Sequence, residues 1–238
     1  MLDAWAPVDV LFADREILYW FEDGEGLFQR DLDVFEEKPD LLPFEEAKLF
    51  GHNATHALAA YVASVQGLRR MAEIPSIPGF MEFLGQAFIE ESGTTLIRKH
   101  RGLDALFTPG GYQEYAEDLL CRMTNPFLTD TVERVGRDPE RKLGWGDRLV
   151  GLMREAFRLS ASPKRYAFGV AAALATLDRS LLGGAKSISS ALDAIWEEES
   201  PPEEERAAIV RMVEAELPRL SNWMSDGFPD LEQLFQGS

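Results

Sequence analysis

The sequence holds one cysteine and three histidines in 238 residues, and this scarcity limits its chemistry. Because Cys121 is alone, no disulfide can form within the chain, and we expect a reducing compartment such as the cytoplasm. Structural zinc sites usually take four cysteine or histidine ligands at short spacings, and the chain has no such set. The sequence therefore predicts no metal. It also predicts that Cys121, next to Leu119 and Leu120, is a buried thiol without a reactive role.

Positive charge is also scarce, since 24 Lys and Arg stand against 41 Asp and Glu, a formal net charge of −17. Nucleic acids and anionic membranes bind proteins through a concentrated basic face, so neither is an expected partner. No apolar run approaches the roughly 18 residues of a membrane span. Acidic residues interrupt the first apolar stretch, unlike in a signal peptide. These absences predict a cytoplasmic protein.

Glycine-rich nucleotide motifs are missing as well. DGEGLFQ at 23–29 has G-x-G without the third glycine, and GGAKS at 183–187 lacks the spacing of a phosphate loop. The sequence therefore predicts no dinucleotide site within this chain.

The pattern of apolar residues predicts a mainly α fold with one or two short N-terminal strands. Residues 8–21 form two short apolar runs rich in β-branched and aromatic types, DGEG at 23–26 is typical of a turn, and 31–43 is an acidic connector with two prolines. Helical periodicity follows. We expect helices over 53–71, 80–99, 112–123, 146–159, 167–182 and 202–220. The predicted division is a residual strand and connector segment over 1–43 and a helical domain over 44–238.

The stretch KLFGHNATH at 48–56 gathers two of the three histidines, a lysine and an asparagine. In an α-helix Lys48, Asn53 and His56 would lie at about 0°, 140° and 80° around the axis. One face could then present an ammonium, an amide and an imidazole to the same small molecule. His52, at about 40° by the same geometry, falls within that arc. The alternative is that Lys48 is solvated and His56 is a core histidine, and spacing alone does not decide.

A second basic concentration lies between 125 and 149, in an otherwise acidic protein. Arginine forks bind phosphate and carboxylate groups with two hydrogen bonds, so a local cluster can hold an anion. The members are Arg134, Arg137, Arg141, Lys142 and Arg148. The alternative is a set of ion pairs with the acidic residues of the same stretch, which are Asp130, Glu133, Asp138, Glu140 and Asp147. Both readings stay open at this point.

Together these stretches resemble the C-terminal domain of the mannitol-1-phosphate 5-dehydrogenases, within the long-chain mannitol dehydrogenase family. The resemblance rests on K-x-x-x-x-N-x-x-H at Lys48, Asn53 and His56, on EESGTTLIRKH at 90–100, on Asn125-Pro126, and on DTVERVGRDPERKL at 130–143. It extends from about Phe44 to Leu182. The resemblance implies a helical C-terminal domain and an oxidoreductase of polyol metabolism.

The resemblance also implies roles for these residues. Lys48 is expected to be the general acid/base that takes the proton from the sugar hydroxyl while hydride leaves for NAD, without a metal. Neighbouring cations, including the histidine, are expected to lower the pKa of Lys48. Asn53 and His56 are expected to bind the reacting oxygen, and Arg134 and Lys142 the polyol. On charge geometry, Arg137 and Arg141 are the candidates for a phosphate.

The family places a nucleotide-binding Rossmann domain before this lysine, whereas 47 residues precede it here. That domain is therefore expected to be absent from this chain, and a separate Rossmann-type chain is a possible partner. The expected function is the catalytic and substrate domain of an NAD-dependent polyol phosphate dehydrogenase that interconverts mannitol 1-phosphate and fructose 6-phosphate. The alternative is a non-catalytic module that binds a sugar phosphate or a partner.

Overall fold

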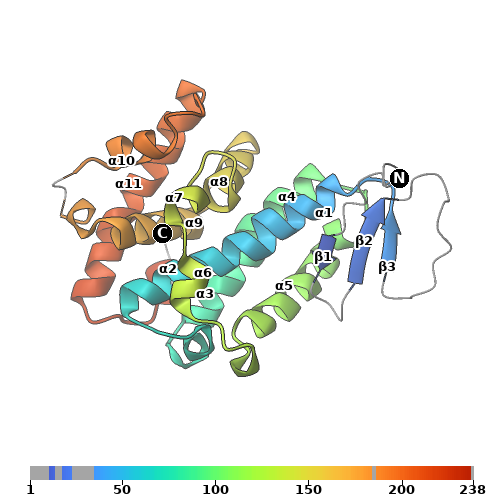
Figure 1. The fold of residues 1–238 in the computed structure, drawn as a ribbon, viewed down its shortest axis with the longest axis horizontal. Helices are drawn as coiled ribbons and strands as arrows, with labels where there is room; N and C mark the ends of the chain where they lie inside the picture. The colour runs from blue at the N-terminus through green and yellow to red at the C-terminus, as the bar shows by residue number, and fades with distance from the viewer. Residues whose placement is uncertain (1–10, 14–17, 23–34, 184–185, 237–238) are drawn as a thin grey trace, which may run out of the picture.

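The computed structural model describes residues 11–13, 18–22, 35–183 and 186–236 (Figure 1). A small sheet of β1 (Leu11–Ala13), β2 (Leu18–Glu22) and β3 (Phe35–Lys38) lies at one end, beside α1. β1 pairs antiparallel and β3 parallel with β2. One or two strands were expected within 8–21, and the structure has two, β1 and β2. The turn expected at 23–26 lies outside the described residues. The prediction that 31–43 is only a connector was wrong. Residues 35–38, with the charged sequence FEEK, form a strand because their backbone pairs with β2.

From residue 42 onward the described chain is helical, as predicted. The α-helices are α1 (Leu42–Glu46), α2 (Ala54–Gln66), α3 (Phe80–Gln86), α4 (Thr94–Lys99), α5 (Pro109–Met123), α6 (Val132–Gly136), α7 (Pro139–Lys142), α8 (Arg148–Arg158), α9 (Lys164–Leu177), α10 (Ile188–Ile195) and α11 (Glu203–Ser225). Two seven-residue π-helices are η1 (Ala47–Asn53) and η3 (Ala87–Gly93). Short 3₁₀ turns are η2 (Met71–Ser76), η4 (Ala105–Phe107), η5 (Pro126–Leu128), η6 (Arg179–Leu181) and η7 (Glu232–Leu234).

Helix α9 forms the centre of the core. Its residues from Tyr166 to Ala175 are all buried, as expected for a helix that is apolar on every side. It packs against α2 and α11. A Cβ at Gly169 would overlap the side chain of Leu58 in α2, so glycine permits the close approach of the two helices. This contact fixes α2, the helix in which the KLFGHNATH stretch ends.

The two π-helices pack against each other and against α5. α1, η1 and α2 run on as one helix over 42–66, and α3, η3 and α4 as another over 80–99. A Cβ at Gly51 would lie 2.6 Å from the Tyr112 hydroxyl, so only glycine fits there. Ser92 of η3 donates to the Phe50 carbonyl at 3.0 Å and lies 2.8 Å from the same hydroxyl. This contact holds the backbone that carries Lys48.

A buried ion pair joins three segments that are distant in sequence. Arg165, at the start of α9, lies 3.2 Å from Glu91 of η3 and 2.5 Å from Glu232 of η7. The backbone N–H of Arg165 also donates to Glu91 at 3.0 Å. The Arg165 guanidinium lies over the ring of Phe235, 5.1 Å from its centroid. The C-terminal segment is thereby tied to the π-helix that supports η1.

The prediction that Cys121 is buried was wrong, because its side chain is exposed. α5 turns Leu119, Leu120 and Met123 toward the core, and Cys121 lies on the outward side of the same helix. None of the described helices is both long and apolar enough to cross a bilayer. The change from strand to helix falls between Lys38 and Leu42, and the division of the chain at 43/44 stays a prediction.

Candidate functional site

Lys48 and Asn53 lie on one side of η1. The N–H of Ala54 donates to the carbonyl of Leu49, five residues back, which is the π-helical pattern. Residues five apart are then about one turn apart, so the α-helical expectation of about 140° between Lys48 and Asn53 was wrong. Both residues line a surface pocket of about 400 Å³ with Glu45, Glu46 and Leu49. The Asn53 amide has no hydrogen-bond partner among the described residues, so it can bind a ligand oxygen.

His56 lies one α-helical turn beyond Asn53, and its Nε2 is buried without a hydrogen-bond partner among the described residues. Burial lowers the pKa of His56 to about 4; Asp130 opposes this shift, and Arg134, Arg148 and Lys142 add to it. The imidazole is therefore neutral at pH 7 and can donate one hydrogen bond and accept another. The expectation that this histidine adds positive charge near Lys48 was wrong, because burial removes its proton.

His52, the other histidine of the stretch, stacks on His56. The ring centroids lie 5.8 Å apart and the planes differ by 16°. This is the arrangement expected of residues four apart on a helix. The contact favours a role for His52 in holding the His56 ring rather than in binding a ligand.

The basic block comes next to His56 because α2 packs against α6. Lys142, at the end of α7, is only 4% exposed. Its ammonium donates to the Arg137 carbonyl and has no carboxylate partner in the described part of the chain. Burial lowers the pKa of Lys142 to about 8, and Arg148 and Arg141 add to the shift. Lys142 is therefore mostly charged at pH 7 and is a buried cation without a paired carboxylate in the described ranges.

The arginines of the block take part in ion pairs, as the alternative reading expected. Arg134 pairs with Asp130, Arg137 lies 3.9 Å from Asp138, and both Arg141 and Arg148 contact Asp147, at 3.6 and 2.7 Å. Arg134, Arg137 and Arg141 are more than half exposed. Exposed pairs contribute only about 0–1 kcal/mol, so these guanidinium groups can exchange an aspartate for a ligand anion. Both readings of the block are thus compatible with the structure.

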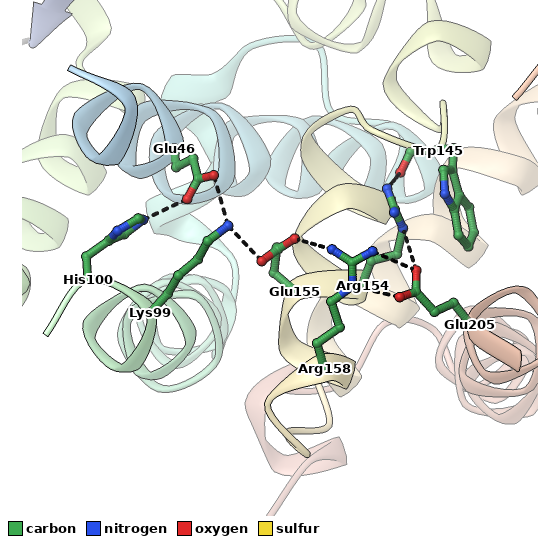
Figure 2. Close-up of polar contacts among 8 residues, drawn as sticks. All are labelled: Glu46, Lys99, His100, Trp145, Arg154, Glu155, Arg158 and Glu205. Atoms are coloured by element: carbon green, nitrogen blue, oxygen red, sulfur yellow. Dashed lines mark hydrogen bonds and ion pairs between the residues drawn. The ribbon is translucent and has the colours of Figure 1, made fainter. Parts of the chain in front are cut away.

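A network of ion pairs braces the helix that carries Lys48 (Figure 2). Glu46 lies 2.7 Å from His100 Nε2 and 2.9 Å from Lys99 Nζ, and Lys99 also binds Glu155 of α8 at 2.7 Å. From Glu155 the network continues through Arg158 to Glu205 of α11. Sequence reasoning missed it, because the members come from separate segments and share no motif.

We expect the buried neutral His56 to make the protein sensitive to acid. The pKa is about 4 in the folded state and about 6.5 when unfolded, so between these values only the unfolded chain binds the proton. Stability is therefore lost as pH falls from 6.5 toward 4, by up to about 3 kcal/mol. In urea unfolding at pH 7 and pH 4.5, His56→Asn should lose less stability than the unsubstituted protein. Equal losses in both proteins would contradict the assignment.

The described residues do not fit a nicotinamide dinucleotide. β3 passes to α1 through Pro39, Asp40 and Leu41, without the glycine-rich turn that receives a pyrophosphate. No group of three or more His, Cys, Asp or Glu among the described residues is placed to hold a metal ion. Among the described residues, the candidate site thus combines the Lys48 amine, the Asn53 amide and the His56 imidazole with the carboxylates of Glu45 and Glu46.

Comparison with known proteins bears on the family and the fold of the chain. Residues 40–220 match the mannitol dehydrogenase C-terminal domain. The mannitol-1-phosphate 5-dehydrogenase of Halalkalibacterium halodurans is 40% identical over 136 residues, which is 57% of this chain and 35% of that protein. The enzyme of the same name from Bacillus licheniformis is 38% identical over 135 residues, 57% of this chain and 34% of that protein. The chain thus spans about a third of the length of these relatives.

Two solved structures share the fold. Pseudomonas fluorescens mannitol 2-dehydrogenase, in a ternary complex with NAD and D-mannitol, has a TM-score of 0.63 at 19% identity, over 88% of this chain and 46% of that chain. A D-sorbitol dehydrogenase in substrate-free form has a TM-score of 0.62 at 16% identity, over 89% of this chain and 46% of that chain. The predicted mainly α fold is confirmed. Because the family match covers most of the sequence, the chain belongs to the mannitol dehydrogenase C-terminal domain family.

Proposed function

We propose that this chain is the acid/base and substrate-binding part of an NAD-dependent polyol phosphate dehydrogenase that interconverts mannitol 1-phosphate and fructose 6-phosphate. The observation that carries the proposal is the helix over 42–66, where Lys48 and Asn53 share a pocket. His56, whose Nε2 has no hydrogen-bond partner among the described residues, follows within one turn. A hydroxyl that is oxidised must lose its proton and must be held in place while it does so. An amine can accept the proton, and an amide and a neutral imidazole can hold the oxygen by hydrogen bonds.

In the proposed oxidation, a C–H and an O–H bond of the alcohol break and a C=O bond forms. A nicotinamide brought by another domain would supply the hydride acceptor, and Lys48 in its neutral amine form accepts the hydroxyl proton. Asn53 and His56 hold the oxygen by hydrogen bonds, which strengthen as negative charge develops on it. In the reverse direction the Lys48 ammonium returns the proton.

The surroundings of Lys48 support this role. Glu46 lines the same pocket and its negative charge would favour the ammonium form of Lys48. However, the Glu46 carboxylate is engaged by Lys99, which compensates its charge. The network in Figure 2 also holds Glu46, at the start of the helix that carries Lys48.

The hydride acceptor has to come from outside the described residues, since these offer no dinucleotide site. We propose that a Rossmann-type domain, in a separate chain or segment, brings NAD to the Lys48 pocket. The substrate side of the reaction requires only the residues described above: Arg134 and Lys142 for the polyol, with Arg137 and Arg141 near the phosphate.

The test is turnover of mannitol 1-phosphate with NAD, and of fructose 6-phosphate with NADH, by the full chain alone and co-expressed with a nucleotide-binding domain of a relative. We expect nicotinamide reduction in the co-expressed sample. No turnover in either sample, together with stabilisation of the chain by mannitol 1-phosphate, would instead establish the non-catalytic binding module, since a ligand that binds only the folded state raises apparent stability.

A further inference from the structure

The π-helix η1 makes one turn of the helix that carries Lys48 wider than the turns of α2. The N–H of Ala54 donates to the carbonyl of Leu49, five residues back. α2 begins at Ala54, and its α-helical pattern pairs each later N–H with the carbonyl four residues back. The carbonyl of Phe50 falls between these two patterns, so the backbone ladder passes it over. Because Phe50 is only 8% exposed, its carbonyl must find another donor.

Ser92 of η3 is that donor. Its hydroxyl donates to the Phe50 carbonyl at 3.0 Å and lies 2.8 Å from the Tyr112 hydroxyl. A serine hydroxyl has a single hydrogen, and the carbonyl accepts it, so Tyr112 is the donor in its contact with Ser92. Both side chains belong to residues that are 0% exposed. A Cβ at Gly93 would lie 2.8 Å from the Tyr112 ring, so this ring is packed closely against η3.

A second pair of hydroxyls contacts the next carbonyl in the same way. Thr55 Oγ1 donates to the Gly51 carbonyl at 2.8 Å and lies 2.7 Å from the Tyr166 hydroxyl. By the same count of hydrogens, Tyr166 donates to Thr55. Both residues are 0% exposed. Burial raises the pKa of Tyr112 and of Tyr166, so their hydroxyls keep the protons that these contacts require.

These hydrogen bonds decide where the wide turn lies. A long helix can accommodate one extra residue at any of its turns, but each placement leaves a carbonyl that the backbone ladder passes over. A buried carbonyl without a donor costs more free energy than an ordinary hydrogen bond contributes. The wide turn is therefore most stable where a neighbouring element supplies a hydroxyl, and Ser92 supplies it at Phe50. This placement keeps Lys48 and Asn53 on one side of the helix.

We propose that the two buried hydroxyl pairs are positioning groups of the acid/base site, namely Tyr112 with Ser92 and Tyr166 with Thr55. None of the four lines the Lys48 pocket, so they act through the backbone of η1 and not on the reacting atoms. They fix the wide turn and thereby hold the amine beside the amide. This inference rests on the proposed function for the role of Lys48 in the reaction. The position of the wide turn belongs to the fold and can be tested without turnover.

The first test locates the wide turn in crystal structures of the unsubstituted full chain, of Ser92→Ala and of a control, Thr124→Val. The Thr124 hydroxyl is also buried and donates to a helix carbonyl, that of Leu120 at 3.1 Å, but it lies at the end of α5. In Ser92→Ala we expect the wide turn to leave 47–53, which rotates Lys48 by about 100° relative to α2. The control should keep it in place. A wide turn that stays at 47–53 in Ser92→Ala overturns the proposal.

The second test measures kcat in the presence of the nucleotide domain, at a temperature where every variant is folded. Misplacement of a reacting group can lower turnover by roughly 100-fold, and we expect a loss of this order in Ser92→Ala. The Kd for mannitol 1-phosphate should change less than kcat, because most of the ligand binds elsewhere. Tyr112→Phe keeps the Ser92 hydroxyl and removes only its donor, so its loss should be smaller. Thr124→Val should change kcat by less than about twofold, although it also removes a buried hydroxyl.

Deletion of His52 provides the matched comparison. It shortens the interval between Lys48 and Asn53 to four residues, about one turn of an α-helix, so no carbonyl is passed over. In this background Ser92→Ala should change kcat by less than about twofold, because the two changes act on the same turn. His52→Ala is the control for the lost ring. In crystals, the deletion variant should keep Lys48 beside Asn53 with or without the Ser92 hydroxyl.

An equal loss of kcat on Ser92→Ala with and without the deletion overturns the proposal, since Ser92 would then act in some way other than through the wide turn. If the unsubstituted chain shows no turnover with the nucleotide domain, the proposed function fails. In that case the crystal structures still decide whether Ser92 fixes the wide turn.

Discussion

Replacing Lys48 with methionine should lower turnover by roughly 100- to 10,000-fold, the usual contribution of a positioned acid/base group. Methionine keeps an unbranched side chain of similar reach and removes only the amine, so the partly exposed surface of η1 should be preserved. The measurement is kcat for mannitol 1-phosphate oxidation in the presence of the nucleotide domain, with the Kd for mannitol 1-phosphate measured alongside. A loss in kcat at constant Kd is the expected result.

The matched control is Lys164→Met, which removes an amine at the start of α9. It should change kcat by less than about twofold, as expected of a partly exposed residue that the site does not use. External amines offer a second readout, because a small primary amine that enters the pocket can replace the missing base. If Lys48→Met keeps full activity, another group accepts the proton and the assignment of Lys48 is wrong.

Replacing Arg165 with methionine should cost roughly 3–5 kcal/mol of unfolding free energy, because it leaves two carboxylates buried without their cation. The side chains of Glu91 and Glu232 are only 8% and 10% exposed. For a chain of this size, such a loss lowers the thermal midpoint by on the order of 10 °C. Thermal and urea unfolding of the variant measure it directly.

Arg158→Met is the matched control, because Arg158 also bridges two glutamates, Glu155 and Glu205. Its side chain is 45% exposed, so water screens the pairs and the carboxylates are resolvated when it is removed. We expect a cost below about 1 kcal/mol. Equal costs for the two arginines would show that burial does not set the strength of the Arg165 bridge.

Much of the fold could be predicted from the sequence, because long amphipathic helices have apolar residues at every third or fourth position, and this period is visible in the sequence. The helices over 109–123, 148–158, 164–177 and 203–225 were expected within a few residues of their ends. Short elements were missed. α6, α7 and α10 contain too few turns to show a period, and β3 is a strand because of its neighbour, not because of its own residues.

The candidate site was only partly predictable. The motif led to Lys48, Asn53 and His56, but nothing in the sequence showed that His56 loses its charge on burial or that Lys142 is buried at all. The sequence also does not show that the Tyr61 hydroxyl is buried without a partner among the described residues, since that depends on tertiary packing. Such properties depend on packing between α2, α6 and α7, which are brought together by the tertiary fold.

In K-x-x-x-x-N-x-x-H, Lys48 and Asn53 are five residues apart and Asn53 and His56 are three apart. This unequal spacing matches a change from π-helix to α-helix along the segment. The first interval matches one turn of the wider η1, and the second matches one turn of the narrower α2. A uniform α-helix would need an interval of four to keep Lys48 above Asn53. Inserting one residue between them would therefore rotate the amine away from its neighbours, whereas deleting one would leave the interval of four that a uniform α-helix accommodates. For Lys48, Asn53 and His56 we therefore expect the number of intervening residues to matter as much as their identity.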